Sequence, residues 1–187
     1  RENVRIESAD GIAYGDVATY SVLTGKADLT GADSRLESDD ITVYANEKFI
    51  YDLDAGRLET SGGGRAIQKT DKGENIIIAD ELLATFDQES SGQDTEGRQM
   101  KTVEAHGNVK ITTPTEIVTG DQLIYQKNTN IAELTGNVEI KREDNILQGS
   151  RAKVNLNTNV STLYGGENGR VRGTFYPSKE GAFSATP

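Results

Sequence analysis

The sequence of 187 residues has no cysteine, no tryptophan, three prolines and one histidine. Without cysteine the chain forms no disulfide, no zinc–thiolate site and no cysteine nucleophile, which fits both the cytoplasm and a bacterial periplasm. No apolar run approaches the roughly 20 residues of a membrane-spanning helix, and the first residues lack the apolar segment of a signal peptide. We therefore expect a soluble chain. From its abrupt start on charged, strand-like sequence we expect a mature or trimmed form.

Basic residues are outnumbered by acidic ones, 20 to 30, so that the net charge is −10 and the pI is near 4.7. Nucleic-acid binders depend on Lys and Arg to neutralise phosphates, so we expect no nucleic-acid partner. Hydrophobic residues make up only 34% of the chain, which is enough for folding around a thin core. We expect one domain over residues 1–176 and a disordered tail over residues 177–187, which begins with a strand-ending proline.

Residues that could carry catalysis are sparse. His106 is the single histidine, and its context "AHGNV" has no nucleophile elbow for a Ser-His-Asp triad. Three acidic clusters could be glycosidase pairs or calcium ligands, but they match no calcium-loop pattern and fit a solvated surface better: Asp39 with Asp40, Asp52 with Asp54, and Asp94 with Glu96. No nucleotide-binding motif is present. We predict a protein that is not an enzyme and has no metal site and no cofactor.

The dominant pattern is an alternation of apolar and polar residues with a period of two, which is typical of half-buried β-strands. It is clear at Leu123 and Tyr125, at Val138 and Ile140, and at Val154 and Leu156. Clusters of turn-forming residues separate these strands, at 54–56, 61–64, 70–73, 106–108, 127–130, 142–144, 156–159 and 165–169. We predict an all-β fold of many short antiparallel strands, with a polar loop over residues 87–99.

An internal repeat runs through the chain. "GDVATYSVLTGKADLTG" at 15–31 aligns without gaps with "GDQLIYQKNTNIAELTG" at 120–136, and the same offset of 105 residues places Val4 over Val109. Five similar units follow one another, over residues 12–31, 36–64, 78–107, 117–136 and 146–169. Each unit has one apolar face that it cannot bury alone, so neighbouring units must stack or fold over one another.

The series "HGNVKI" and "LTGNVEI", followed by "I-x-x-G-D-x-L-x-Y" or "L-Q-G-S-x-A-x-V-x-L", resembles the OstA-like family of periplasmic lipopolysaccharide-transport proteins. The match is best over residues 105–176, which end in "GRVRGTFYP". The resemblance implies a folded-over antiparallel β-jellyroll whose two sheets enclose an apolar slot for acyl chains. Asp33 and Arg35 stand where the later unit has Val138 and Ile140, so we expect a short or bulged strand there.

The resemblance also implies a role and partners. Proteins of this family carry lipopolysaccharide through the periplasm, and copies join into a bridge between an inner-membrane LptC-like protein and an outer-membrane LptD-like protein. The same domain occurs in all three components. The lack of an anchor or a barrel in this sequence favours the bridge component of the LptA type. Two alternatives remain open: a polysaccharide-active β-solenoid enzyme with paired carboxylates in an open polar groove, and a structural envelope adaptor.

The alternating apolar residues have two interpretations, ordinary core packing or the lining of a lipid slot. Under the second, the predicted lipid-binding residues are Ile76, Ile78, Leu82, Phe86, Val109, Ile111, Leu123, Tyr125, Leu134, Val138, Ile140, Val154 and Leu156. A strand stack that does not close also leaves unpaired edges. We predict such edges at residues 3–8, with Val4 and Ile6, and at 169–176, with Val171 and Phe175. These edges predict head-to-tail self-association.

Overall fold

The computed structural model describes residues 4–8, 11–38, 41–86, 100–166 and 169–176. Within these ranges it has seventeen β-strands, and no helix there could cross a membrane. The predicted polar loop at 87–99 and the predicted tail at 177–187 lie outside the described residues. The strands are β1 (Val4–Ser8), β2 (Gly11–Gly15), β3 (Val17–Ser21), β4 (Lys26–Thr30), β5 (Arg35–Ser38), β6 (Ile41–Ala45), β7 (Lys48–Asp52), β8 (Arg57–Ser61), β9 (Gly64–Thr70), β10 (Gly73–Ala79), β11 (Glu81–Phe86), β12 (Met100–Thr112), β13 (Ile117–Gln126), β14 (Ile131–Arg142), β15 (Asn145–Asn155), β16 (Val160–Tyr164) and β17 (Arg172–Thr174).

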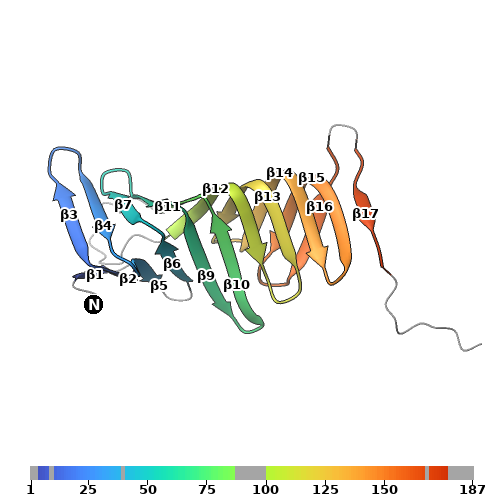
Figure 1. The fold of residues 1–187 in the computed structure, drawn as a ribbon, viewed down its shortest axis with the longest axis horizontal. Helices are drawn as coiled ribbons and strands as arrows, with labels where there is room; N and C mark the ends of the chain where they lie inside the picture. The colour runs from blue at the N-terminus through green and yellow to red at the C-terminus, as the bar shows by residue number, and fades with distance from the viewer. Residues whose placement is uncertain (1–3, 9–10, 39–40, 87–99, 167–168, 177–187) are drawn as a thin grey trace, which may run out of the picture.

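Every strand pair is antiparallel, and the pairs form two facing layers along an elongated molecule (Figure 1). Layer A contains β1, β2, β5, β6, β9, β10 and β17, and layer B contains β3, β4, β7, β8, β11 and β16. The long strands β12 to β15 run through both layers. The predicted all-β, folded-over antiparallel jellyroll is therefore confirmed.

The long strands change layer at β-bulges. The ladder between β12 and β13 shifts register between His106 and Val109, where Gly107 and Asn108 have φ angles of 73° and 46°. Glycine and asparagine are the residues that adopt positive φ most readily. Asn108 Nδ2 also donates a hydrogen bond to Asp80 Oδ2 at 2.7 Å. The prediction of a turn at 106–108 is wrong, because these residues form a corner within one strand.

Four other predicted turns are confirmed. Those at 70–73, 127–130, 142–144 and 156–159 each join two consecutive paired strands, as predicted. The strand expected to be short after Gly31 is β5, which has four residues and starts only at Arg35. Before it, the fully buried Ser34 donates a hydrogen bond through Oγ to the carbonyl oxygen of Gly31 at 3.1 Å.

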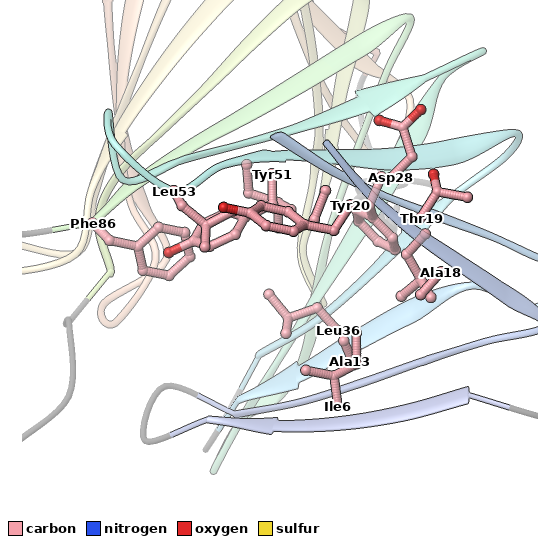
Figure 2. Close-up of a pocket in the computed structure, with 14 residues that line it drawn as sticks. Ile6, Ala13, Ala18, Thr19, Tyr20, Asp28, Leu36, Tyr51, Leu53 and Phe86 are labelled. Carbon is pink, nitrogen blue, oxygen red and sulfur yellow. The ribbon is translucent and has the colours of Figure 1, made fainter. Parts of the chain in front are cut away.

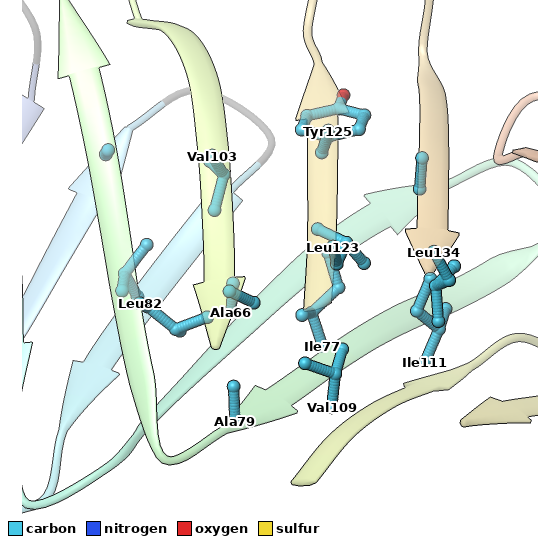
Figure 3. Close-up of a cluster of buried hydrophobic side chains, with 14 of the residues drawn as sticks. Ala66, Ile77, Ala79, Leu82, Val103, Val109, Ile111, Leu123, Tyr125 and Leu134 are labelled. Atoms are coloured by element: carbon cyan, nitrogen blue, oxygen red, sulfur yellow. The ribbon is translucent and has the colours of Figure 1, made fainter. Parts of the chain in front are cut away.

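The core lies between the layers and is made by the alternating side chains of both (Figure 3). Its largest fully buried apolar side chains are Val109, Ile111, Val118, Leu123, Leu134, Val138 and Val154. These residues come from β12 to β15, the strands that belong to both layers. The most deeply buried part of the core is therefore in the C-terminal half.

The inward position in β10 differs from the prediction by one residue. Ile77 points inward with 7% of its surface exposed, whereas Ile78 is 43% exposed and Ile76 is half-buried. Three consecutive isoleucines contain no alternation, so their sequence does not determine which of them faces the core. The pairing of β10 with its neighbouring strands determines the orientation, because Ile77 lies opposite Ala66 on β9 and Ile111 on β12, both of which are inward.

Candidate functional site

The 105-residue repeat is also a repeat of strand pairing. Val4 pairs with Gly15 as Val109 pairs with Gly120. Likewise Tyr20 pairs with Ala27, and their equivalents Tyr125 and Ala132 pair with each other. The two copies nevertheless differ in burial, since 57% of the surface of Tyr20 is exposed and only 2% of that of Tyr125.

Position in the stack explains this difference. The second copy is flanked on both sides, because β12 pairs with β10 and β11 as well as with β13. The first copy stands at the end of the molecule, where the described residues give β1 only β2 as a neighbour and β3 only β4. Side chains that are covered in the second copy therefore face open space in the first.

A cavity of about 380 Å³ opens between the layers at this end. Ile6, Ala13 and Leu36 of layer A face Tyr20, Tyr51 and Leu53 across it (Figure 2). The complete lining, hereafter the N-terminal pocket, is Ile6, Ala13, Ala18, Thr19, Tyr20, Ala27, Asp28, Leu29, Leu36, Phe49, Tyr51, Leu53, Leu58 and Phe86. Apolar and aromatic side chains dominate this lining, which is typical of a ligand site.

The pocket has an aromatic wall and little charge. Tyr51 and Phe86 meet edge to face, with ring centroids 6.2 Å apart and an interplanar angle of 88°. The single ionisable carboxylate in the lining is Asp28, whose Oδ2 accepts a hydrogen bond from Lys48 Nζ at 2.8 Å. Such a surface can hold a flexible apolar chain, and it offers no pair of carboxylates for acid–base chemistry.

The C-terminal half is closed by contacts from the β9–β10 hairpin to the turns of layer B. Asn75 Nδ2 donates to the carbonyl oxygen of Leu156 at 3.4 Å, and Lys72 Nζ donates to that of Asn157 at 3.0 Å. Gln68 Nε2 on β9 donates to Asn130 Oδ1 at 3.4 Å, and the same oxygen accepts from the hydroxyl of Tyr125 at 2.6 Å. The space beneath these contacts is only about 20 Å³. An acyl chain has no room there while the contacts hold.

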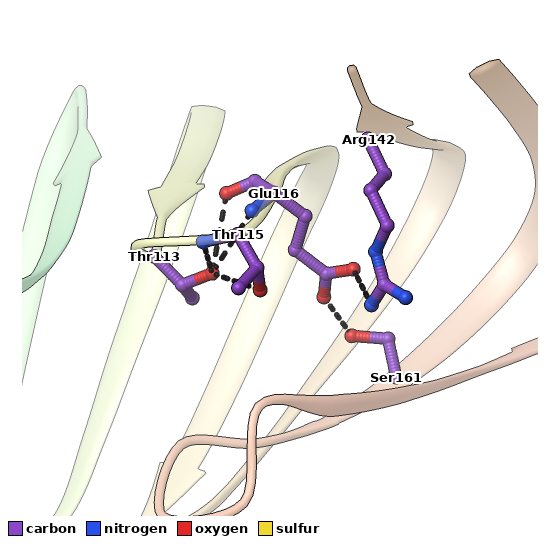
Figure 4. A network of polar contacts seen from close by, with 5 residues as sticks. All are labelled: Thr113, Thr115, Glu116, Arg142 and Ser161. Carbon is purple, nitrogen blue, oxygen red and sulfur yellow. Dashed lines mark hydrogen bonds and ion pairs between the residues drawn. The ribbon is translucent and has the colours of Figure 1, made fainter. Parts of the chain in front are cut away.

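A second set of cross-layer contacts surrounds Glu116, which is 4% exposed (Figure 4). Its Oε2 accepts a hydrogen bond from Arg142 Nη2 at 2.8 Å, and its Oε1 accepts one from the hydroxyl of Ser161 on β16. Thr113 Oγ1 accepts from the backbone N–H of Glu116 at 3.2 Å. This carboxylate ties the loop before β13 in layer A to layer B, so its role is structural.

The remaining candidates for chemistry are dispersed. His106 Nε2 lies 3.7 Å from Glu104 Oε2, and both side chains are well exposed. Among the described residues no three His, Asp or Glu side chains are grouped as metal ligands. Asp52 Oδ1 accepts a hydrogen bond from the N–H of Ala55 in a turn, and its Oδ2 lies 3.7 Å from Lys26 Nζ. Asp39, Asp40, Asp94 and Glu96 lie outside the described residues.

Comparison with known families identifies the fold. Residues 69–160, just under half of the chain, match the family model described as LptA/(LptD N-terminal domain) LPS transport protein. Over these residues the chain is similar to this lipopolysaccharide-transport family.

Comparisons with individual proteins add little to this. LptH of Pseudomonas aeruginosa, described as the LptA-homologous periplasmic component of the lipopolysaccharide transport device, is 10% identical. The alignment covers 88% of this chain and 94% of LptH, with a TM-score of 0.35. No curated protein matches the chain significantly.

The predicted lipid-binding residues divide between the two halves of the chain. Phe86 lines the N-terminal pocket, whereas Ile76 and Ile78 lie on the outer face of layer A. The other ten are buried in the packed core: Leu82, Val109, Ile111, Leu123, Tyr125, Leu134, Val138, Ile140, Val154 and Leu156. Among the predicted edge residues, Ile6 lines the pocket and Val4 packs against the core. Val171 and Phe175 are exposed near β17, at the opposite end.

Sequence reasoning missed most of the pocket. Tyr20, Leu36, Phe49, Tyr51 and Leu58 all line it, and none was among the candidates. The repeat contained a usable signal, because Tyr20 and Leu29 align with Tyr125 and Leu134 and so had to face the space between the layers. Of the fourteen lining residues only Phe86 falls within the segment matched by the family model.

Proposed function

We propose that this chain carries lipopolysaccharide through the periplasm by holding its acyl chains in the N-terminal pocket. The observation that carries the proposal is an open cavity of about 380 Å³ with apolar and aromatic walls at one end of a lipopolysaccharide-transport fold. The sugar headgroup remains in water, and no covalent step occurs. As proposed here, the carrier is a single domain over residues 1–176, acts as a bridge component of the LptA type and needs no cofactor.

The physical driving force is removal of acyl methylenes from water. Each buried CH₂ contributes roughly 0.8 kcal/mol, so ten methylenes contribute roughly 8 kcal/mol before the cost of association. Asp28 does not oppose this, because its charge is matched by Lys48. The closed half has no such space, so an acyl chain could pass through it only when the β9–β10 hairpin separates from the layer B turns.

Photo-crosslinking tests the pocket. A crosslinking amino acid at Leu36 or Tyr51, which line the pocket, is expected to form strong adducts with lipopolysaccharide. The same amino acid at Ile124, which is 50% exposed, is the control for nonspecific contact, and Leu123 reports on the closed core. Gel mobility shifts and lipopolysaccharide blotting measure the adducts. Equal adducts at Ile124 and Leu36 would rule the pocket out.

We also propose head-to-tail self-association, because exposed apolar side chains gather at the two ends. Among the described residues, ten of the twelve large exposed hydrophobic side chains lie there. At the N-terminal end they are Ile6, Val17, Tyr20, Val22 and Leu23, and at the other end Val160, Tyr164, Val171, Phe175 and Tyr176. Contacts between unlike ends generate filaments, and the terminal copies can meet LptC-like and LptD-like proteins in the same way.

The edge strands of layer B are the best candidates for the contact between copies of the chain. Natural edge strands are usually guarded against pairing by charges or proline. The edge strands β3, "VATYS", and β16, "VSTLY", contain neither. By contrast, the edge strands of layer A both carry arginine, Arg5 in β1 and Arg172 in β17. We therefore add β3 and β16, which lack such protection, to the edges predicted at residues 3–8 and 169–176.

Lysine substitution tests the β3 edge. Replacing both Val17 and Thr19 with lysine is expected to abolish concentration-dependent oligomers, because each new charge would be desolvated in the joint. The matched control is Gln122→Lys with Ile124→Lys, which occupies the equivalent repeat positions on the interior strand β13. Sedimentation velocity measures the outcome. An unchanged oligomer distribution in the β3 variant would show that this edge is not the joint.

The first alternative function, that of a polysaccharide-active enzyme, requires an open polar groove with paired carboxylates. The N-terminal pocket instead contains one carboxylate, that of Asp28, in an ion pair. The structural adaptor would use the same edges without binding lipid. Lipopolysaccharide crosslinks at Leu36 would separate the carrier from the adaptor.

A further inference from the structure

The outer face of layer A carries a row of alternating arginine and tyrosine side chains. Direct cross-strand pairing joins Arg5, Tyr14, Arg35, Tyr44 and Arg65, one residue from each of β1, β2, β5, β6 and β9. The guanidinium carbon of Arg35 lies 4.1 Å from the ring centroid of Tyr14, and that of Arg65 lies 4.6 Å from the ring centroid of Tyr44. Cation–π contact thus orients both guanidinium groups.

The three arginines differ in their charge partners. Arg5 pairs with Glu7, and Arg35 Nε lies 2.7 Å from Glu37 Oε1, so each partner lies two residues further along the same strand. Hydrogen bonds with Tyr14 and then Glu7 raise the pKa of the Arg5 guanidinium. The equivalent neighbour of Arg65 is Ile67, and Arg65 forms no ion pair with any residue that the structure describes. Its exposed positive charge is therefore available to a ligand.

The row continues from Arg65 through Ile78 on β10 to Lys110 on β12. Lys110 is exposed and likewise has no carboxylate partner within the described ranges. Two strand spacings separate the backbones of Arg65 and Lys110, about 10 Å, so their long side chains can converge above Ile78. Ile78 and Ile124 are the two large exposed apolar side chains away from the ends of the described structure.

A second cavity of about 380 Å³ lies beside this group. Its lining includes Asp33, Ser34, Tyr44, Asn46 and Arg65, together with Ile78. Asn46 Nδ2 donates to the carbonyl oxygen of Gly62 at 3.0 Å, which fixes the amide and leaves its oxygen as an acceptor. The hollow is thus lined both by hydrogen-bond acceptors, on Asp33 and Asn46, and by the positive charge of Arg65.

We propose that this hollow binds a sugar unit that carries one anionic group. The phosphate or carboxylate pairs with Arg65 and Lys110, ligand hydroxyls donate to Asp33 and Asn46, and an apolar ring face rests on Ile78. A bare anion would leave most of the volume unfilled, and Asp33 would repel a second anion. Strand alternation places this site on the opposite face of layer A from the N-terminal pocket, so it does not depend on acyl-chain binding.

Titration of the ¹⁵N-labelled full chain with glucose 6-phosphate, followed by NMR, tests the site. We expect shifts of the backbone amides of Ser34, Asn46, Arg65 and Ile78, and affinity above that of glucose or inorganic phosphate. Arg65→Gln should weaken binding roughly tenfold, the value of one charge-assisted hydrogen bond. Arg35→Gln is the matched control, because it removes the same charge and an equivalent tyrosine contact from the same row, and it should leave the affinity unchanged.

Three outcomes would overturn the proposal: equal affinity in the native chain and Arg65→Gln, equal weakening by Arg35→Gln, or binding of inorganic phosphate as tight as that of glucose 6-phosphate. Amide spectra of both variants establish that they are folded. A second arm uses the deacylated saccharide of lipopolysaccharide. Tighter binding in this arm assigns the site to the headgroup of lipopolysaccharide, and tighter binding of glucose 6-phosphate assigns it to a separate acidic sugar.

Discussion

Replacing Tyr125 with alanine is expected to lower the free energy of unfolding by about 3–5 kcal/mol, whereas the same change at Tyr20 should alter it by no more than about 0.5 kcal/mol. The two tyrosines occupy equivalent positions of the repeat and pair with equivalent alanines. Tyr125 is 2% exposed and donates its hydroxyl to Asn130, but Tyr20 is 57% exposed at the rim of the N-terminal pocket. The difference therefore isolates the effect of burial.

Urea unfolding monitored by circular dichroism measures both variants against the native chain. Tyr125→Phe separates the hydroxyl from the ring, and the loss of one hydrogen bond should cost about 1 kcal/mol. Similar losses for Tyr20→Ala and Tyr125→Ala would mean that the first copy of the repeat is as well packed as the second. The N-terminal pocket would then be filled in solution.

Filling the N-terminal pocket is expected to weaken lipopolysaccharide binding strongly without unfolding the protein. Ala18→Trp places a large side chain on β3 where a small one lines the cavity of about 380 Å³. Because Ala18 is exposed to this open space, the new ring need not displace core atoms. It instead occupies the volume that acyl chains would take, so the affinity should fall at least about a hundredfold, equivalent to roughly four lost methylenes.

Val17→Trp is the matched control, since Val17 is the neighbouring residue on β3, is 55% exposed and does not line the pocket. The affinity of each variant for fluorescent lipopolysaccharide is measured by anisotropy. Thermal unfolding of both variants checks that they are equally stable. If Ala18→Trp bound like the native chain while Val17→Trp lost affinity, the edge of β3 would be the binding element. The pocket would then have no part in binding.

The sequence predicts this fold well wherever alternation alone sets the orientation. Leu123 and Tyr125 are buried as predicted, because a period of two leaves a strand only one way to face its core. The prediction fails where local sequence permits two outcomes. Gly107 and Asn108 adopt positive φ in a layer-crossing corner, although the same residues also suit a hairpin turn. Only the long-range pairing of β12 with β13 distinguishes these structures.

The location of the site is harder to predict, because it depends on which neighbours are missing. Ile6 and Ile111 match in the repeat, yet Ile6 is 45% exposed and Ile111 is fully buried. No property of either isoleucine predicts this. The number of strands on each side does, and that number becomes known only when the whole stack is assembled.

The breaks between strands differ between the two halves of the molecule. In β12 to β15 the backbone passes from one layer to the other without leaving a strand, so a change in the angle between the layers must bend four strands and the three ladders that join them. In the first half the chain leaves regular structure at every crossing, through Asp16 after β2, residues 31–34 after β4, residues 46–47 after β6 and residues 62–63 after β8. In the first half, therefore, short non-strand segments connect the two layers, whereas in the second half continuous hydrogen-bonded strands connect them.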